Sequence, residues 1–265
     1  LGGIGAGVGT AIAFYINLLL NVLVVSRLKP FRDYHVLQGL ARPSLREWKK
    51  QLSVGIPIGC TMFCEQSIFG AVGLFMTVYG TSVVAAHQAA LNFTTMVYMI
   101  PMSVSMALTI LVGYELGAGR QPDARRYNRL GRWISMAFAA GLAALLVNFR
   151  GVIASLYTND AAVQELIMVF LLYAIGMQLA DGFNAPLQGT LRGYKDVRAT
   201  FFLAVLSFWI LGLPAGWLLA HYTSAGPYGY WIGLIVGILM GGIMLTLRLH
   251  VVEKRYALSG TASTK

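Results

Sequence analysis

The sequence predicts an all-α polytopic membrane protein with about seven transmembrane helices. Of its 265 residues, 57% are hydrophobic and only 11% are charged, a balance typical of membrane proteins rather than of soluble domains. Each apolar run is too long and too uniformly apolar for the alternating strands of an outer-membrane barrel, so all are expected to be helices. The runs long enough to cross a bilayer lie near 2–25, 52–79, 82–113, 132–150, 163–189, 199–220 and 228–250.

The positions of the basic residues predict the topology. Alternate connections hold 19 of the 20 Lys and Arg residues, and the other connections hold only Arg150. By the positive-inside rule the basic connections are cytoplasmic. The first helix therefore starts outside and the C-terminus is cytoplasmic. We expect a multi-pass protein of a bacterial inner membrane, and the net charge of +10 needs no nucleic acid to explain it.

Four segments follow from this topology. Residues 1–25 are predicted to be a transmembrane helix, and residues 26–51 a cytoplasmic linker. The stretch from Ser44 to Glu47 matches a capping box and predicts a short amphipathic helix on the inner membrane surface. Residues 52–250 form the remaining six helices and residues 251–265 a cytoplasmic tail. An odd number of spans that begins outside leads us to expect the C-terminal part of a longer protein.

Two acids lie deep in the predicted spans. A helix from Leu52 to Tyr79 would be about 42 Å long against about 30 Å of hydrocarbon, so Glu65 is far from either surface. Asp181 lies in the run 163–189, and the other eight acids lie in loops, in the tail or near a membrane edge. Neither deep acid has a Lys or Arg at a similar depth. They are therefore expected to be protonated or neutralised by a bound cation; the alternative is two protonated acids that only join helices by hydrogen bonds.

Polar side chains recur along the run 82–113 at nearly helical spacing. Gln88, Asn92 and Thr95 share one side, which we expect to face the interior or a cavity, although hydrogen bonding between helices would also explain them. Pro101, further along this run, is expected to kink the helix.

A second polar stripe, in the run 163–189, consists of Gln178, Asp181, Asn184 and Gln188. With Gly176, Gly182 and Pro186 nearby, it predicts a water-accessible lining with an irregular backbone. The last two spans carry no acid and look like packing helices, with a kink expected at Pro214.

Enzymatic and cofactor sites are not expected. The four histidines, at positions 35, 87, 221 and 250, are scattered along the chain. Cys60 and Cys64 lie in a predicted span and are too few for a disulfide framework or a zinc site. We therefore expect no enzyme and no cofactor other than a coupling ion.

Five stretches resemble the MATE (multidrug and toxic compound extrusion) transporters, and in particular their NorM branch. They are PIGCTMFCEQSIF (57–69), HQAALNF (87–93), PMS (101–103), VGYELGAG (112–119) and LRGYKD (191–196). The resemblance implies twelve helices in two lobes, of which this chain provides the C-terminal lobe and the helix before it. It also implies export of cationic, often aromatic drugs in exchange for sodium or protons.

The resemblance further implies a cation site at Glu65, Tyr98 and Asp181, with sodium bound at Glu65 and Asp181 in a sodium-coupled member. We expect a substrate cavity lined by Phe69, Gln88, Asn92, Phe93, Gln178 and Asn184. The partners implied are organic cations, the lipid bilayer and the missing N-terminal lobe. Two alternatives stay open: a lipid-linked saccharide flippase of the same superfamily, and an inactive truncated fragment.

Overall fold

The computed structural model describes residues 2–28 and 44–262, which form helices joined by turns. The chain divides into two units, residues 1–51 and 52–265. Most of the first unit is α1 (Gly2–Arg27), whose described side chains are mostly exposed. Residues 29–43, which hold most of the predicted linker, lie outside the described residues.

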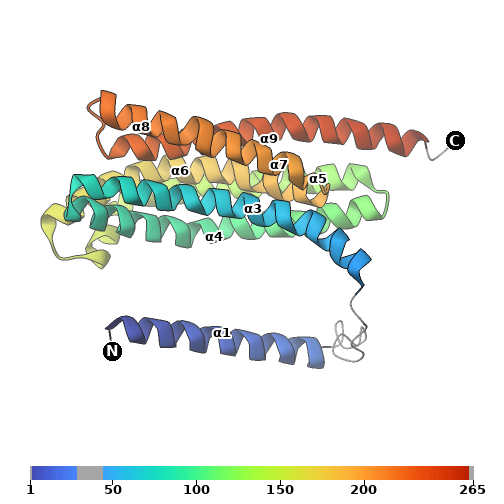
Figure 1. Ribbon diagram of the computed structural model, residues 1–265, viewed down its shortest axis with the longest axis horizontal. Helices are drawn as coiled ribbons and strands as arrows, with labels where there is room; N and C mark the ends of the chain where they lie inside the picture. Colours follow the sequence, from blue (N-terminus) through green and yellow to red (C-terminus); the bar gives the residue numbers. More distant parts are fainter. Residues whose placement is uncertain (1, 29–43, 263–265) are drawn as a thin grey trace. The chain divides into compact units, whose positions relative to one another are not determined.

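The second unit is a bundle of helices that run side by side along one axis (Figure 1). Its elements are α3 (Leu45–Met76, which begins in the first unit), a 3₁₀ turn η1 (Thr77–Tyr79), α4 (Thr81–Gly117), α5 (Gln121–Tyr157), α6 (Ala161–Gly193), α7 (Val197–Ala204), a π-helical segment η2 (Val205–Gly212), α8 (Leu213–Tyr222) and α9 (Tyr228–Ala262). The described residues contain seven helices long and apolar enough to cross a membrane, α7 to α8 counting as one. The predicted fold class is confirmed.

The helices extend beyond the apolar runs. α3 is continuous from Leu45, so the predicted surface helix and the span after it are one helix. α5 likewise begins at Gln121 rather than near residue 132, and α9 runs on into the predicted tail. Hydropathy marks the thickness of the hydrocarbon, whereas backbone hydrogen bonding continues into the polar residues on either side.

The backbone departs from α-helical geometry beside Pro214, where a kink was predicted, and not in the run 163–189, where an irregular backbone was also predicted. α4 stays α-helical through Pro101, and α6 through Pro186. The π-helical turn occurs instead at Val205–Gly212, directly before Pro214. Proline has no N–H to donate to the carbonyl four residues earlier, and a wider turn is one way for a helix to accommodate that loss.

The core of the bundle is centred on α6, which packs against α4, α5 and α9. α3 contributes Ile68, Val72 and Met76, which are spaced by one helical turn and are almost fully buried. At Gly189 the backbones of α4 and α6 touch, because a Cβ there would overlap the carbonyl oxygen of Ser105. Thr109 Oγ1 also donates to the Gly189 carbonyl oxygen at 3.0 Å.

Candidate functional site

A cavity of about 720 Å³, including its open mouth, lies among α3, α4 and α6, with one residue each from η2 and α9. It brings together both deep acids, Glu65 from α3 and Asp181 from α6, and Tyr98 from α4. Helix packing thus brings together residues that are far apart in the sequence: positions 65 and 98 are 33 residues apart, and positions 98 and 181 are 83 residues apart. The full lining is Glu65, Gln66, Phe69, Leu91, Thr94, Thr95, Tyr98, Met177, Asp181, Asn184, Ala185, Gln188, Phe208 and Ile238.

The Glu65 carboxylate is held by an amide. Gln188 Nε2 donates to Glu65 Oε1 at 2.6 Å, and Gln188 Oε1 accepts from Arg192 Nη2 at 3.1 Å. Because a guanidinium can only donate, it fixes which end of the amide faces Glu65. Arg192 therefore acts on Glu65 through Gln188, and no ion pair between described residues includes Glu65 or Asp181.

This link was not found from the sequence, although a signal for it exists. Gln188 belongs to the predicted polar stripe, and Arg192 follows it by four residues on α6, a spacing that places the two side chains on one face. In the predicted topology Arg192 belongs to a basic cytoplasmic connection. Side chains on a helix point toward its N-terminus, however, which for Arg192 is the direction of Gln188.

Two of the six expected cavity residues line the cavity, namely Phe69 and Asn184. Two others, Gln88 and Asn92, are exposed, and Asn92 Oδ1 accepts from the Tyr157 hydroxyl at 3.0 Å. Thr95, the third residue of the predicted face, does line the cavity, together with Leu91, Thr94 and Tyr98 of α4.

The remaining two expected residues lie elsewhere, Phe93 half-buried and Gln178 buried. Phe93 packs against the hydrophobic core. Gln178 Nε2 donates to the Thr94 carbonyl oxygen at 2.9 Å, which joins α6 to α4. Gln178 therefore joins two helices and does not belong to the water-accessible lining predicted for its stripe.

The last two spans contribute to the site, contrary to their expected role as packing helices. Phe208 in η2 and Ile238 in α9 line the cavity. Trp209 Nε1 donates to the carbonyl oxygen of Cys64 at 3.1 Å, next to Glu65 in the chain. An apolar residue carries no polarity signal that would have identified Phe208 or Ile238 from the sequence.

The cavity lining is rich in hard oxygen atoms. It includes two carboxylates, the oxygens of Tyr98 and Asn184, and the hydroxyls of Thr94 and Thr95. Within the described ranges no three His, Cys, Asp or Glu side chains gather as a transition-metal site would require. The lining contains no Lys or Arg, and aromatic, Met and aliphatic side chains supply its apolar part.

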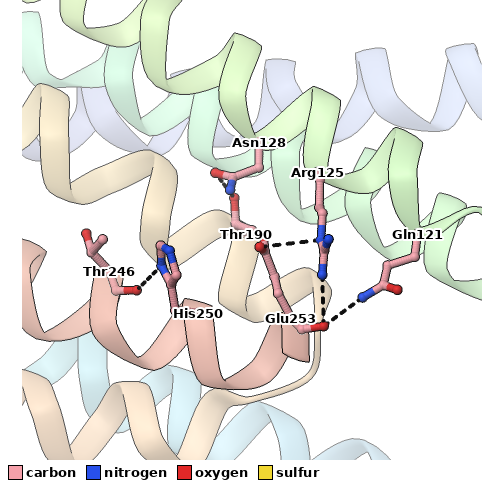
Figure 2. A network of polar contacts seen from close by, with 7 residues as sticks. All are labelled: Gln121, Arg125, Asn128, Thr190, Thr246, His250 and Glu253. Carbon is pink, nitrogen blue, oxygen red and sulfur yellow. Dashed lines mark hydrogen bonds and ion pairs between the residues drawn. The ribbon is translucent and has the colours of Figure 1, made fainter. Parts of the chain in front are cut away.

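The acids at one end of the bundle are in a different environment. This end, here called the basic end, carries the turns at 118–120 and 194–196. Figure 2 shows Glu253 of α9 meeting two residues of α5: Arg125 Nη2 and Gln121 Nε2 donate to its carbonyl oxygen at 3.0 and 2.9 Å. Arg125 Nε also lies 3.5 Å from Glu253 Oε2. Nearby, Thr190 Oγ1 donates to Asn128 Oδ1 at 3.1 Å (Figure 2).

Further pairs join the helices at the basic end. Arg248 donates through Nε and Nη2 to the two oxygens of Asp196, at 2.6 and 3.1 Å. Arg120 Nε donates to Glu115 Oε2 at 2.6 Å, and this hydrogen bond raises the pKa of Arg120 above its ordinary value. In the 194–196 turn, burial raises the pKa of Tyr194 to about 12.

Comparison with known proteins gives consistent relatives. The family model MatE matches residues 57–218. A protein named "Probable multidrug resistance protein NorM" from Halalkalibacterium halodurans is 48% identical over 258 residues, covering 97% of this chain and 56% of that protein. One of the same name from Bacillus subtilis is 44% identical over 257 residues, covering 97% of this chain and 57% of that protein.

Solved structures share the fold. The eukaryotic MATE transporter AtDTX14 superimposes with a TM-score of 0.86 at 20% identity, over 100% of this chain and 59% of that one. The Vibrio cholerae MATE transporter VcmN in its bent form gives 0.79 at 20% identity, over 96% and 57%. The chain thus spans less than three fifths of the length of these relatives. Because the family match runs from α3 into α8, over more than half of its residues, the chain belongs to the MATE family.

Proposed function

We propose that this chain supplies the cation site of a multidrug antiporter, which exports organic cations in exchange for sodium or protons. The observation that carries the proposal is the cavity in which Glu65, Asp181 and Tyr98 meet without an ion pair among the described residues. Two carboxylates at membrane depth are costly unless something neutralises them. The printed name of the bacterial relatives, multidrug resistance protein, agrees with this use.

The mechanism is mutual exclusion between the coupling ion and the drug. A cation that reaches Glu65 and Asp181 from outside compensates one of their two negative charges, and so weakens the attraction that holds a cationic drug. Phe69, Met177 and Phe208 give the cavity adaptable apolar surface for drugs of different shapes. The ion can drive the exchange only through a difference in its affinity for the two states of the transporter.

Orientation and location belong to the same proposal. The basic end is cytoplasmic, because Lys and Arg in short loops stay on that side of the membrane, and the membrane is a bacterial inner membrane. The flippase alternative needs cationic side chains for a lipid diphosphate, and none of the cavity residues is Lys or Arg. We propose no enzymatic reaction and no cofactor besides the coupling ion.

The test is sodium binding to the purified chain in lipid nanodiscs, measured by calorimetry at two pH values. Wild type should bind sodium saturably and more weakly at the lower pH, because protons compete for the same carboxylates. Glu65→Gln and Asp181→Asn should each lower the affinity at least about a hundredfold, the upper range for altered metal sites. The control is Glu165→Gln, an exposed acid near the other end of α6, which should bind as wild type does.

The result against the proposal is binding that neither substitution changes. Absence of sodium binding together with a carboxylate that titrates at membrane depth, seen by infrared spectroscopy, would instead select protons as the coupling ion. Transport itself is tested in a chimera in which the N-terminal part of the Halalkalibacterium relative precedes this chain. Drug efflux that is lost with Glu65→Gln in the chimera, and kept with Glu165→Gln, separates a working transporter from an inactive fragment.

A further inference from the structure

A second, smaller cavity lies on another side of Glu65. Its volume is at most about 190 Å³ when its open mouth is included, and its walls come from α3, α6, α7, η2 and α9. It shares Glu65, Asn184, Gln188 and Phe208 with the large cavity, but Asp181 and Tyr98 do not line it. Its other polar residues are Thr200 of α7 and Ser207 of η2. We call this space the inner chamber.

Three polar residues that line the inner chamber carry oxygen atoms with unused lone pairs. Asn184 is 4% exposed, and its Oδ1 is buried without a hydrogen-bond partner. Ser207 and Thr200 are almost fully buried, and their hydroxyl hydrogens go to the carbonyl oxygens of Ala204 and Asp196, at 3.2 and 2.9 Å. Since both hydroxyl hydrogens are used, the lone pairs of these oxygens are left over. A buried acceptor without a partner is costly, and Asn184, whose Oδ1 is such an acceptor, lines both cavities.

The size and chemistry of the inner chamber select a small cation. Pockets for drug-sized ligands usually have about 300 Å³ or more, so this space is too small for a second drug. Neutral oxygens together with one carboxylate are hard ligands that suit sodium. A neutral guest with hydrogens to donate, such as water, would satisfy Asn184 but would leave the Glu65 charge without a counter-ion.

Two features of the backbone make room for this site. The π-helical turn, a form common at functional sites, carries Ser207. On the opposite wall a Cβ at Gly241 would lie 3.1 Å from Ser207 Oγ and 3.6 Å from Asn184 Nδ2. The absence of a side chain at Gly241 therefore keeps the space between these two polar groups open.

We propose that the inner chamber is a second site for the monovalent coupling cation, built from Asn184, Thr200 and Ser207, and sharing the Glu65 carboxylate with the large cavity. The inference rests on the proposed function. Thr200 stands one helical turn from the start of α7 at the 194–196 turn, so the inner chamber lies between Glu65 and the basic end. In this proposal a cation moves from Asp181 to Ser207, toward the basic end, by passing the Glu65 carboxylate, and it does not enter lipid.

The experiment is sodium calorimetry on the purified chain with Ser207→Ala and Thr200→Val. Each should weaken sodium binding roughly tenfold, the effect typical of losing one supporting group of a metal site, and Thr200→Ser should restore it. Two controls remove the same kind of hydroxyl outside both cavities. Ser155→Ala removes a hydroxyl that donates to the carbonyl three residues earlier, and Thr246→Val one that donates to the carbonyl four residues earlier. Both should bind as wild type does.

A melting temperature measured without sodium separates lost binding from lost folding. One outcome is sodium binding that is unchanged in Ser207→Ala and Thr200→Val but lost in Asp181→Asn. That result overturns the proposal of a second site in the inner chamber and leaves the proposed function intact. If the wild-type chain binds no sodium at a pH where carboxylates are ionised, neither the second site nor the proposed function can use sodium as the coupling ion. Weaker binding in the two chamber variants, with wild-type melting and unaffected controls, supports the second site.

Discussion

The acids in the middle of the bundle and those at its basic end are the same two residue types in opposite situations. Glu115, Asp196 and Glu253 each meet an arginine from a neighbouring segment. Glu65 and Asp181 line a cavity and, within the described residues, belong to no ion pair. A paired acid contributes to the stability of the fold, whereas an unpaired one at membrane depth lowers it until a ligand arrives. The difference separates residues that hold the helices together from residues that are available to bind.

The link from Arg192 through Gln188 to Glu65 connects these two regions. It brings the influence of a cation to the cavity without placing a positive charge in the cavity lining. A direct Arg–Glu pair would satisfy the carboxylate and compete with a coupling ion. An intervening amide orients Glu65 and leaves its second oxygen, Oε2, for a ligand.

The largest effect expected from this contrast is on stability in sodium. At a sodium concentration one hundred times the dissociation constant, wild type should gain about 2.7 kcal/mol of unfolding free energy. Glu65→Gln and Asp181→Asn should gain almost nothing, and without sodium each should melt at or above the wild-type temperature, because an unpaired buried carboxylate has been removed. Thermal unfolding with and without sodium, with potassium as the control salt, measures this. Equal sodium stabilisation in all three proteins would contradict the contrast.

A somewhat smaller effect, of opposite sign, is expected for Asp196→Asn at the basic end. It breaks a two-point hydrogen-bonded pair with Arg248 and should cost about 2 kcal/mol of unfolding free energy. Its sodium affinity should equal that of wild type. Chemical unfolding in mixed micelles measures the loss. Arg248→Lys keeps the positive charge but not the two-point hydrogen bonding of the guanidinium, so its free energy of unfolding should lie between those of wild type and Asp196→Asn. A lower sodium affinity in Asp196→Asn would show that the basic end and the cavity are not independent.

The smallest effect is expected for Arg125→Ala. The Arg125 side chain is 43% exposed and lies 3.5 Å from the carboxylate of Glu253, so the charge interaction is screened. The loss should be about 0.5 kcal/mol and should shrink as salt is added. Repeating the unfolding measurement at low and high salt tests this. A loss as large as that of Asp196→Asn would place Arg125 among the main supports of the fold.

The fold could be predicted from the sequence because crossing a bilayer imposes a length that apolar runs reveal directly. The helix ends could not be predicted from hydropathy, because the mostly polar stretches 45–51 and 121–131 are helical as well. The π-helical segment was not predicted because the composition of Val205–Gly212 is that of an ordinary apolar helix. Pro214 marked the right span, but a proline does not reveal which local form accommodates it.

The part of the candidate site that could be predicted consists of residue types that are rare inside a membrane. Glu65 and Asp181 are exceptional at their depth, so their positions alone identified them as candidates. Amides are not exceptional in this way, because Gln178 between two helices and Asn184 in a cavity have the same polarity. Which of them faces the cavity depends on the rotation of α6 against α4, and several contacts distant in sequence set that rotation. Whether these residues bind a cation stays a prediction.

The backbone contact at Gly189 has a consequence for measuring movement in this protein. There α4 and α6 approach so closely that no side chain fits between them, and the Thr109 hydroxyl ties the two backbones together. Such a contact resists both separation and sliding, so the two helices provide a fixed frame of reference. Spectroscopic labels placed on α4 and α6 near this contact give a constant baseline, against which a changed distance to α3 or α8 can be assigned to the helix that moved.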